Sequence, residues 1–268
     1  MSRPILHFAH ANGFPGQSYR VLLEPMQSQW QVKVLDRLGH QPDFPVNHNW
    51  QALVDELLQH LDQTCNHHPV IGVGHSLGGA ITYMAALKAP ERFSQIILLD
   101  PPILTGIDSL GLKLGKRFGF IDKITPAGIT KGRRSHFPDQ ATAIKYFTHK
   151  KLFKNFHPQA LEDYINFGTE PRATGGIQLR FSPAVEIAIF RHLADNLTGS
   201  HRKLKVPASI IRGESSDLIT HEREQRLRKM GFEMHCVPGG HMFPLEHPEQ
   251  TRQCLEKILT SRLQLNKT

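Results

Sequence analysis

The run GVGHSLGG at residues 72–79 surrounds a single hydroxyl, that of Ser76, with four glycines. A serine hydroxyl is a weak nucleophile until a neighbouring base accepts its proton, and it can then attack a carbonyl carbon. Residues 74–78 match the pattern G-x-S-x-G, which holds a nucleophile on a sharp strand-to-helix turn. Neighbouring backbone crowds the positions two before and two after the serine, so glycine is needed there. The sequence therefore predicts Ser76 as a catalytic nucleophile.

Other uses of a glycine-rich turn fit this run less well. A dinucleotide-binding G-x-G-x-x-G that starts at Gly72 would need glycine at position 77, which is Leu77. A phosphate-binding P-loop would need Gly-Lys-Ser or Gly-Lys-Thr, and neither follows. The remaining alternative is a tight turn with an incidental serine, which the partner residues must decide.

A nucleophile on this turn requires an acid and then a histidine later in the chain. Asp217 follows the predicted strand 207–213, and His241 follows the predicted strand 232–237. Both loops should lie at the same edge of the sheet as Ser76. We therefore predict that His241 accepts the serine proton and that Asp217 holds the imidazole by its other nitrogen.

Two other carboxylates compete for the role of the acid. Asp100 also ends a predicted strand, although the following Pro101-Pro102 would constrain it. Glu214 lies one short loop from Asp217 and is the weaker rival. Both alternatives stay open at this point.

Backbone amides that could stabilise an oxyanion are expected in two places. Residues 10–16, HANGFPG, follow the first predicted strand and can bring an amide opposite the serine. The amide of Leu77 begins the helix after the nucleophile and supplies a second donor. We predict Asn12 as the donor in the loop, with Phe14 as the alternative because the loop carries extra residues.

Strands and helices alternate in the first hundred residues and again near the end of the chain, which is typical of a parallel sheet covered on both faces. A helix is expected over residues 18–27, although Pro25 would end it early. Apolar residues at helical spacing predict a second helix from Trp50 to Leu61. The predicted strands are residues 5–10, 30–36, 69–75, 93–100, 207–213 and 232–237, and the other helices of this core are residues 79–88, 222–230 and 249–263.

The alternation stops between residues 101 and 202, where only residues 152–164 and 183–193 look helical. We predict one α/β core made of residues 1–100 and 203–268, with residues 101–202 as a helical cap inserted between them. An insertion after the strand that ends at Asp100 would cover the carboxyl ends of the strands, where open α/β sheets bind ligands. Its phenylalanines either line an acyl pocket or form the cap's own core: Phe118, Phe120, Phe147, Phe153 and Phe190.

Composition and charge are those of a globular protein without a specialised partner. The 268 residues are 39% hydrophobic and carry a net charge of +8, spread over short basic clusters without a nucleic-acid motif. Three cysteines make no disulfide framework and suit a cytoplasmic location. No apolar run approaches the length of a membrane span, so we expect no membrane insertion. A homo-oligomer is left open.

The motifs together resemble those of the serine α/β-hydrolases. HANGFPG is similar to that family's oxyanion loop, GHSLGG to its nucleophile turn, RGESSD to its acid loop and GGHMFPLEHP to its histidine loop. The chain starts at the strand that carries the oxyanion loop, so the first two of the usual eight strands are absent and about six remain. The resemblance implies an α/β-hydrolase fold and hydrolysis through an acyl-enzyme, with no cofactor and no metal.

The resemblance leaves three functions open. The first is a carboxylesterase that acts on small or medium esters. The second is a carbon–carbon bond hydrolase or a menaquinone-type lyase, whose anionic substrate Arg133, Arg134 or Arg180 could bind. The third is a binding protein that has the fold but no activity, against which the intact serine, acid and histidine argue.

Overall fold

The centre of the structure is a sheet of six strands in which each strand runs parallel to its neighbours. The computed structural model describes residues 3–265, with side chains described through residue 261. The strand order is β2-β1-β3-β4-β8-β9, which confirms the predicted α/β-hydrolase fold with about six parallel strands. The strands are β1 Ile5–Ala9, β2 Gln31–Leu35, β3 Val70–His75, β4 Phe93–Leu99, β8 Ala208–Gly213 and β9 Glu233–Val237.

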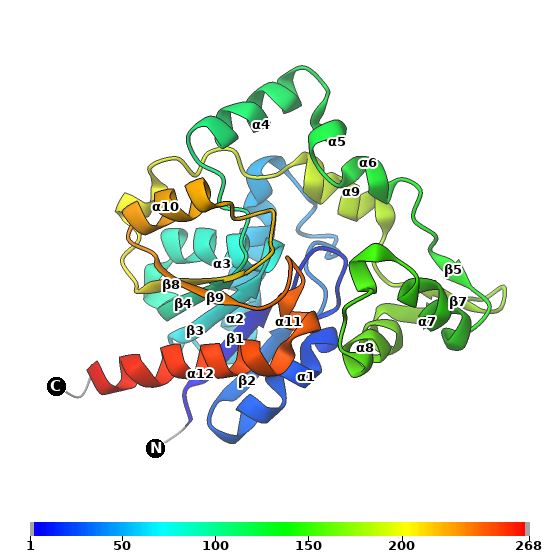
Figure 1. The fold of residues 1–268 in the computed structure, drawn as a ribbon, viewed down its shortest axis with the longest axis horizontal. Coiled ribbons are helices and arrows are strands. Elements are labelled where there is room, and N and C mark those ends of the chain that lie inside the picture. Colours follow the sequence, from blue (N-terminus) through cyan, green and yellow to red (C-terminus); the bar gives the residue numbers. More distant parts are fainter. Residues whose placement is uncertain (1–2, 266–268) are drawn as a thin grey trace.

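Helices cover both faces of this sheet (Figure 1). On one face α2 (Gln51–Cys65), α3 (Leu77–Lys88) and α10 (His221–Lys229) pack into one hydrophobic cluster. On the other face α1 (Arg20–Leu23) and α12 (Pro248–Leu265) pack into a second cluster. Because both faces are covered, strands β3 and β4 are almost entirely apolar and buried. The sheet is therefore a rigid platform for the loops at its edges.

Two predicted helices of the core differ in how well the sequence anticipates them. The apolar stripe on α2 is buried as predicted, with Leu53, Leu57 and Leu61 inaccessible to solvent. The helix expected over residues 18–27 is instead broken, because Pro25 starts a separate turn after α1. The short 3₁₀ helices of the chain are Gly16–Tyr19, Pro25–Ser28, His48–Trp50, Pro90–Arg92, Lys151–Phe153 and Ser200–Lys203.

The segment between β4 and β8 holds six short helices and a small sheet of its own. The helices are α4 Ile107–Arg117, α5 Ile121–Ile124, α6 Ala127–Thr130, α7 Gln140–Thr148, α8 Pro158–Gly168 and α9 Pro183–Arg191. The small antiparallel sheet has the order β5-β7-β6, with β5 His136–Phe137, β6 Thr169–Pro171 and β7 Ile177–Leu179. The prediction of a purely helical segment missed these strands, since two or three residues are too few to form a pattern.

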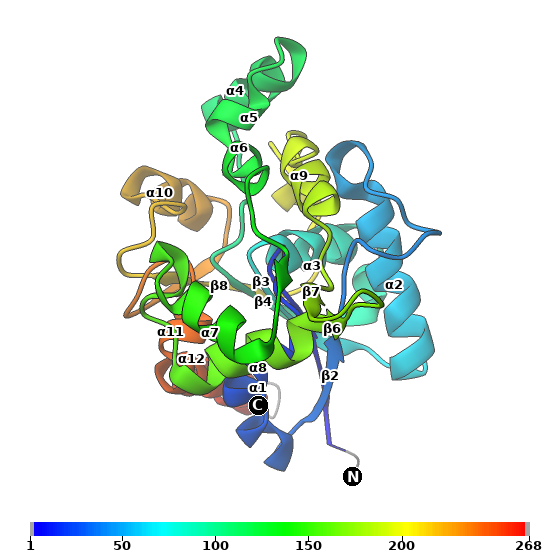
Figure 2. The same ribbon diagram turned by 90° about the vertical axis from the view of Figure 1, so that its right-hand side faces the viewer.

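Two parts of this segment lie apart from each other (Figures 1 and 2). Helices α4, α5 and α6 form an arm that projects from the body, whereas α7 and α8 pack against its side. Helix α8 starts at Pro158, later than predicted, because residues 151–153 form a separate 3₁₀ turn.

Candidate active site

Ser76 sits on the tight turn between β3 and α3 that the sequence predicts. Its backbone has φ 52° and ψ −116°, a conformation that costs an L-residue of order 1–3 kcal/mol. A side chain at Gly74 would lie 2.4 Å from the Gly78 carbonyl oxygen, and one at Gly78 would lie 2.2 Å from the Ala9 carbonyl oxygen. Only glycine fits at both positions, so the pattern around Ser76 is required by the turn itself.

His241 is brought directly against Ser76. Its Nε2 atom lies 2.9 Å from Ser76 Oγ, a hydrogen-bond distance at which the imidazole can accept the serine proton. The histidine follows β9 in a loop that Glu246 holds, because its carboxylate accepts a hydrogen bond of 2.8 Å from the Gly240 amide. The His241 side chain is 34% exposed and Ser76 is half-buried, so both residues are partly accessible from outside the protein.

The structure corrects the predicted acid. The carboxylate that holds His241 is that of Asp100, whose Oδ2 lies 2.6 Å from His241 Nδ1. Asp217 is exposed, and no hydrogen bond or ion pair joins it to the imidazole within the described residues. Glu214, the weaker rival, is also exposed. Asp100, which the sequence offers as an alternative, is fully buried and takes the place that we predicted for Asp217.

Asp100 reaches the imidazole because of its unusual backbone. It has a φ of 43°, in the left-handed region, and its amide donates a 2.8 Å hydrogen bond to the Ile211 carbonyl of β8. The loop predicted to carry the acid contributes instead the hydroxyl of Ser216, which donates to Asp100 Oδ2. Pro101 therefore does not prevent the role of Asp100. The strained turn before that proline aims the carboxylate at the site.

The loop over residues 10–16 lies beside the nucleophile turn, since the Gly78 amide donates to the His10 carbonyl at 3.1 Å. Phe14, the alternative oxyanion donor, already uses its amide in a 3.1 Å hydrogen bond to the Ala11 carbonyl. In residues 3–265 we find no protein acceptor for the amides of Asn12 and Leu77. Both predicted donors thus have free backbone amides, and their role stays a prediction.

A buried chain of hydrogen bonds joins the oxyanion loop to the histidine loop. The Ala11 amide donates to the Tyr19 hydroxyl at 3.3 Å, and that hydroxyl donates to His75 Nδ1 at 2.7 Å. His75 Nε2 then donates to the His241 carbonyl at 2.8 Å, because a carbonyl can only accept. Burial lowers the pKa of His75 well below its ordinary value and keeps the ring neutral. Sequence reasoning missed Tyr19 and His75 because no local pattern links them.

A second cluster braces the oxyanion loop from the side of α9. The Arg133 guanidinium pairs with the buried Glu186 carboxylate and also contacts the Tyr164 hydroxyl. A Cβ atom at Gly13 would lie 2.7 Å from Glu186 Oε2. The side-chain amide of Asn12 donates through Nδ2 to the Glu186 backbone carbonyl at 3.2 Å. Arg133 is therefore neutralised inside the protein and is not free to bind an anionic substrate.

The other two arginines considered for an anionic substrate are also engaged. Arg180 pairs with Asp36 at 3.1 Å and donates to the Phe167 carbonyl at 2.7 Å. The Arg134 guanidinium stacks on the Phe137 ring, 4.8 Å from its centroid. Arg134 is exposed and has no ion pair within the described residues, so only the pairing of Arg133 and Arg180 weakens the case for a carbon–carbon hydrolase or a menaquinone-type lyase.

The five phenylalanines considered for an acyl pocket do not form one group. Phe147 and Phe153 are buried, with ring centroids 4.8 Å apart, and both pack on Tyr164 of α8. Phe118 and Phe120 are exposed on the arm, and Phe190 is half-buried on α9. Because Phe14 of the oxyanion loop packs 5.8 Å from Phe153, the buried pair borders the site from one side only.

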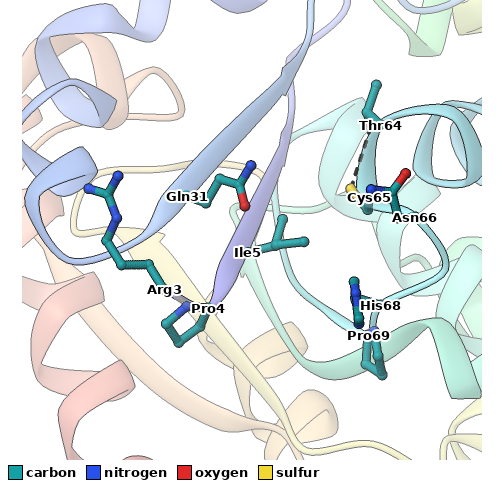
Figure 3. A pocket seen from close by; sticks show the side chains of 9 residues that line it. All are labelled: Arg3, Pro4, Ile5, Gln31, Thr64, Cys65, Asn66, His68 and Pro69. Carbon is teal, nitrogen blue, oxygen red and sulfur yellow. Dashed lines mark hydrogen bonds between the residues drawn. The ribbon is translucent and has the colours of Figure 1, made fainter. Parts of the chain in front are cut away.

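A hollow on the surface lies away from this site (Figure 3). It has a volume of about 370 Å³. Its lining comes from the amino ends of β1 and β2 and from the chain before β3: Arg3, Pro4, Ile5, Gln31, Thr64, Cys65, Asn66, His68 and Pro69. Ser76 and Asp100 follow the carboxyl ends of their strands, at the opposite edge of the parallel sheet. This hollow therefore has no part in the proposed chemistry.

Two searches of the described residues bear on metals and membranes. Residues 3–265 contain no group of three or more histidine, cysteine, aspartate or glutamate side chains arranged to hold a metal ion. In the same part of the chain, every helix is too short or too polar to cross a bilayer.

The comparisons with known proteins agree with the fold. A model of the alpha/beta hydrolase family matches residues 8–253, and the chain belongs to that family. The family and the names of the relatives support its assignment as a hydrolase.

Two relatives illustrate different degrees of similarity. The 2-(acetamidomethylene)succinate hydrolase of Mesorhizobium japonicum is 23% identical over 268 residues, which cover 96% of this chain and 88% of that protein. The monoglyceride lipase of Rattus norvegicus is 38% identical, but only over 80 residues, or 28% of this chain. The match spans about a quarter, 26%, of that lipase.

Solved structures show the same fold at low sequence identity. The crystal structure of E-2-(acetamidomethylene)succinate hydrolase superposes with a TM-score of 0.78 at 22% identity, over 97% of this chain and 92% of the other. An esterase of M. tuberculosis superposes with a TM-score of 0.72 at 19% identity, over 97% of this chain and 86% of the other. At such identities the likeness concerns the fold alone.

Proposed function

We propose that the protein is a serine hydrolase that cleaves carboxylic esters through an acyl-enzyme. The proposal rests on one observation, the unbroken chain of contacts from Ser76 Oγ to His241 (2.9 Å) and from His241 to the buried Asp100 (2.6 Å). A nucleophile, a base within reach of its proton and a carboxylate that orients the base are the three parts that this chemistry needs.

In the first half of the reaction, Ser76 Oγ attacks the ester carbonyl carbon while His241 Nε2 accepts the serine proton. Asp100 stabilises the imidazolium that forms and keeps Nδ1 protonated. The tetrahedral oxyanion accepts hydrogen bonds from the amides of Asn12 and Leu77, and each such donor typically contributes about 10²–10³ in rate. His241 then protonates the leaving alcohol, and the acyl group stays on Ser76.

In the second half, water replaces the alcohol. His241 accepts a proton from the water as its oxygen attacks the acyl carbonyl, and the same amides stabilise the second oxyanion. Collapse releases the carboxylic acid and returns the proton to Ser76. Every proton passes through the His241–Ser76 pair, so no cofactor is needed to balance the reaction.

The relatives support the class of reaction and leave the substrate open. The names of the monoglyceride lipase and of the esterase describe hydrolysis of esters, which agrees with our proposal. The Mesorhizobium japonicum relative, whose match covers 96% of the chain, is named for a succinate derivative, and such a substrate is anionic. Because Arg133 and Arg180 are already paired, we favour a neutral ester over an anionic substrate.

Turnover of p-nitrophenyl esters from acetate to decanoate, together with labelling by a fluorophosphonate, tests the proposal. The variant Ser76→Ala should lose the label and at least about 10³-fold in kcat/KM. Its matched control is Ser215→Ala, which removes an exposed serine from a loop at the same edge of the sheet. A purified, folded protein that hydrolyses none of these esters, or a Ser76→Ala variant that keeps its turnover, would contradict the proposal.

A further inference from the structure

The exposed apolar side chains of the protein are concentrated on the arm, residues 107–130, which comprises α4, α5 and α6. Seven of the eight large hydrophobic side chains that are exposed within the described residues belong to it, and the eighth is Leu152. Ile107 is 78% exposed, Phe118 68% and Ile129 85%. Both ribbon views show the arm projecting from the body (Figures 1 and 2). A patch of this kind on a folded protein marks a surface that binds something.

Helix α4 carries an apolar stripe on its solvent-facing side. Ile107, Leu110, Leu114 and Phe118 follow the spacing of one helical face, and all four are exposed. On the inward side, Leu112 packs into the hydrophobic core, Ser109 donates to the Asp195 carbonyl, and Lys116 pairs with Asp195 at 2.7 Å. The helix therefore turns an apolar stripe toward solvent, and its inward side combines one core leucine with polar anchors.

Ion pairs fix the arm in this orientation. Asp108 at the start of α4 pairs with Arg223 of α10 at 2.8 Å. Asp122 of α5 pairs with Arg191 of α9 at 2.7 Å. With α4 and α5 each anchored to another helix, the arm is held in place with its apolar stripe outward.

The charges around the stripe are positive. Lys113, Arg117 and Lys123 are exposed, and none of them forms an ion pair within the described part of the chain. At 100° per residue, Lys113 and Arg117 lie on one flank of the apolar stripe of α4. The two acidic groups of the arm, Asp108 and Asp122, are already neutralised by arginines. The outer surface of the arm thus combines apolar side chains with unpaired cations.

We propose that the arm docks the protein on an anionic lipid surface. Apolar side chains that enter the boundary between headgroups and acyl chains, with lysine and arginine at the level of the lipid phosphates, are the pattern of helices that lie in a membrane interface. The arm follows β4 directly, and α4 begins seven residues after Asp100. Docking would therefore turn the edge of the sheet that holds Ser76 toward the lipid, with no helix crossing the bilayer.

Flotation with lipid vesicles tests the docking. The unmodified protein should float with vesicles of equal parts phosphatidylglycerol and phosphatidylcholine, and much less with phosphatidylcholine alone. The variant Ile107→Ser/Phe118→Ser/Ile129→Ser should bind the anionic vesicles at least about 10-fold more weakly, because it loses the buried apolar area. The control Leu152→Ser removes an apolar side chain that is 49% exposed outside the arm, and it should bind like the unmodified protein.

The cations are tested separately with Lys113→Gln/Arg117→Gln. This variant should lose about 30-fold in affinity for the anionic vesicles at low salt and lose little for neutral ones. Circular dichroism and thermal unfolding check that each variant is folded. Because vesicle binding is measured without turnover, this test is independent of the proposed hydrolysis.

Three outcomes would overturn the proposal. The first is the absence of vesicle binding by the unmodified protein, and the second is equal binding by the triple variant. The third is a concentration-dependent dimer in sedimentation that the triple variant abolishes, with no vesicle binding, which would mean that the stripe pairs two copies of the chain.

Discussion

The edge of the sheet that holds Ser76 and the arm that projects from it place polar and apolar groups in opposite ways. At the edge, the Asp100 carboxylate is fully buried and accepts hydrogen bonds from two partners, and His75 is sealed between two loops. On the arm, polar groups anchor the helix and most of the large apolar side chains face solvent. Substitutions at the edge should therefore change chemistry and stability, whereas those on the outer face of the arm should leave the chemistry unchanged.

The largest effect that we expect is that of Asp100→Asn. An amide in place of the buried carboxylate favours the wrong tautomer of His241 and cannot stabilise the imidazolium, so kcat should fall by about 10⁴-fold. Steady-state turnover of a short-chain p-nitrophenyl ester measures the loss. The matched control is Asp217→Asn, which changes the exposed aspartate that the sequence favours, and its kcat should stay within about 3-fold.

The opposite result would restore the original prediction. If Asp217→Asn loses the activity and Asp100→Asn keeps it, the contact between Asp100 and His241 is not part of the mechanism. Neither variant changes the arm, so both should bind anionic vesicles as the unmodified protein does. This binding is an internal check.

The difference between these two aspartates also marks how far the sequence can predict the site. Ser76 and His241 can be located because each follows from a local pattern and its place after a strand. Asp100, Glu214 and Asp217 all follow strands that end at the same edge. Which of them faces the imidazole depends on the φ of 43° at Asp100 and on its packing against Ser216, and no local pattern encodes either.

The fold shows the same division between what is local and what is not. The six strands can be predicted because each combines an apolar run with turn residues at its ends. The segment between β4 and β8 resists prediction because its strands have two or three residues and its longest exposed stripe, from Ile107 to Phe118, imitates a buried helix face. Only the structure reveals that this stripe points outward.

The second prediction concerns Gly78 at the nucleophile turn. In Gly78→Ala the new methyl group would lie 2.2 Å from the Ala9 carbonyl oxygen, so the backbone of β1 or α3 must shift. We expect a loss of roughly 3 kcal/mol in the free energy of unfolding, with a fall in activity because Ser76 moves with the turn. Urea unfolding and ester turnover measure the two effects, and a variant as stable as the unmodified protein would contradict the crowding.

The third prediction concerns the pH dependence of stability that the buried His7 of β1 causes. Burial and the neighbouring His60 lower the pKa of His7 from 6.5 to about 3. Because the unfolded chain binds this proton more readily, the stability from neutral His7 is complete above pH 6.5 and is lost as the pH falls toward 3. When the pH falls from 7 to 5, the free energy of unfolding of His7→Leu should fall by about 2 kcal/mol less than that of the unmodified protein.

Urea unfolding at the two pH values measures this difference. The control His149→Leu, at an exposed position, should lose as much stability as the unmodified protein. An acid sensitivity of His7→Leu equal to that of the unmodified protein would show that His7 is protonated equally in the folded and unfolded chains.

The smallest predicted effect lies on the arm and has the opposite sign to that at Gly78. A side chain added at Gly111, in the middle of α4, would meet no atom within 4 Å. Gly111→Ala should therefore stabilise the helix by about 0.5–1 kcal/mol, because alanine loses less backbone freedom on folding than glycine does. Thermal unfolding detects this gain, while kcat on a short-chain ester should be unchanged. A loss of stability would mean that the outer face of α4 is already covered in solution, as it would be between two copies of the chain.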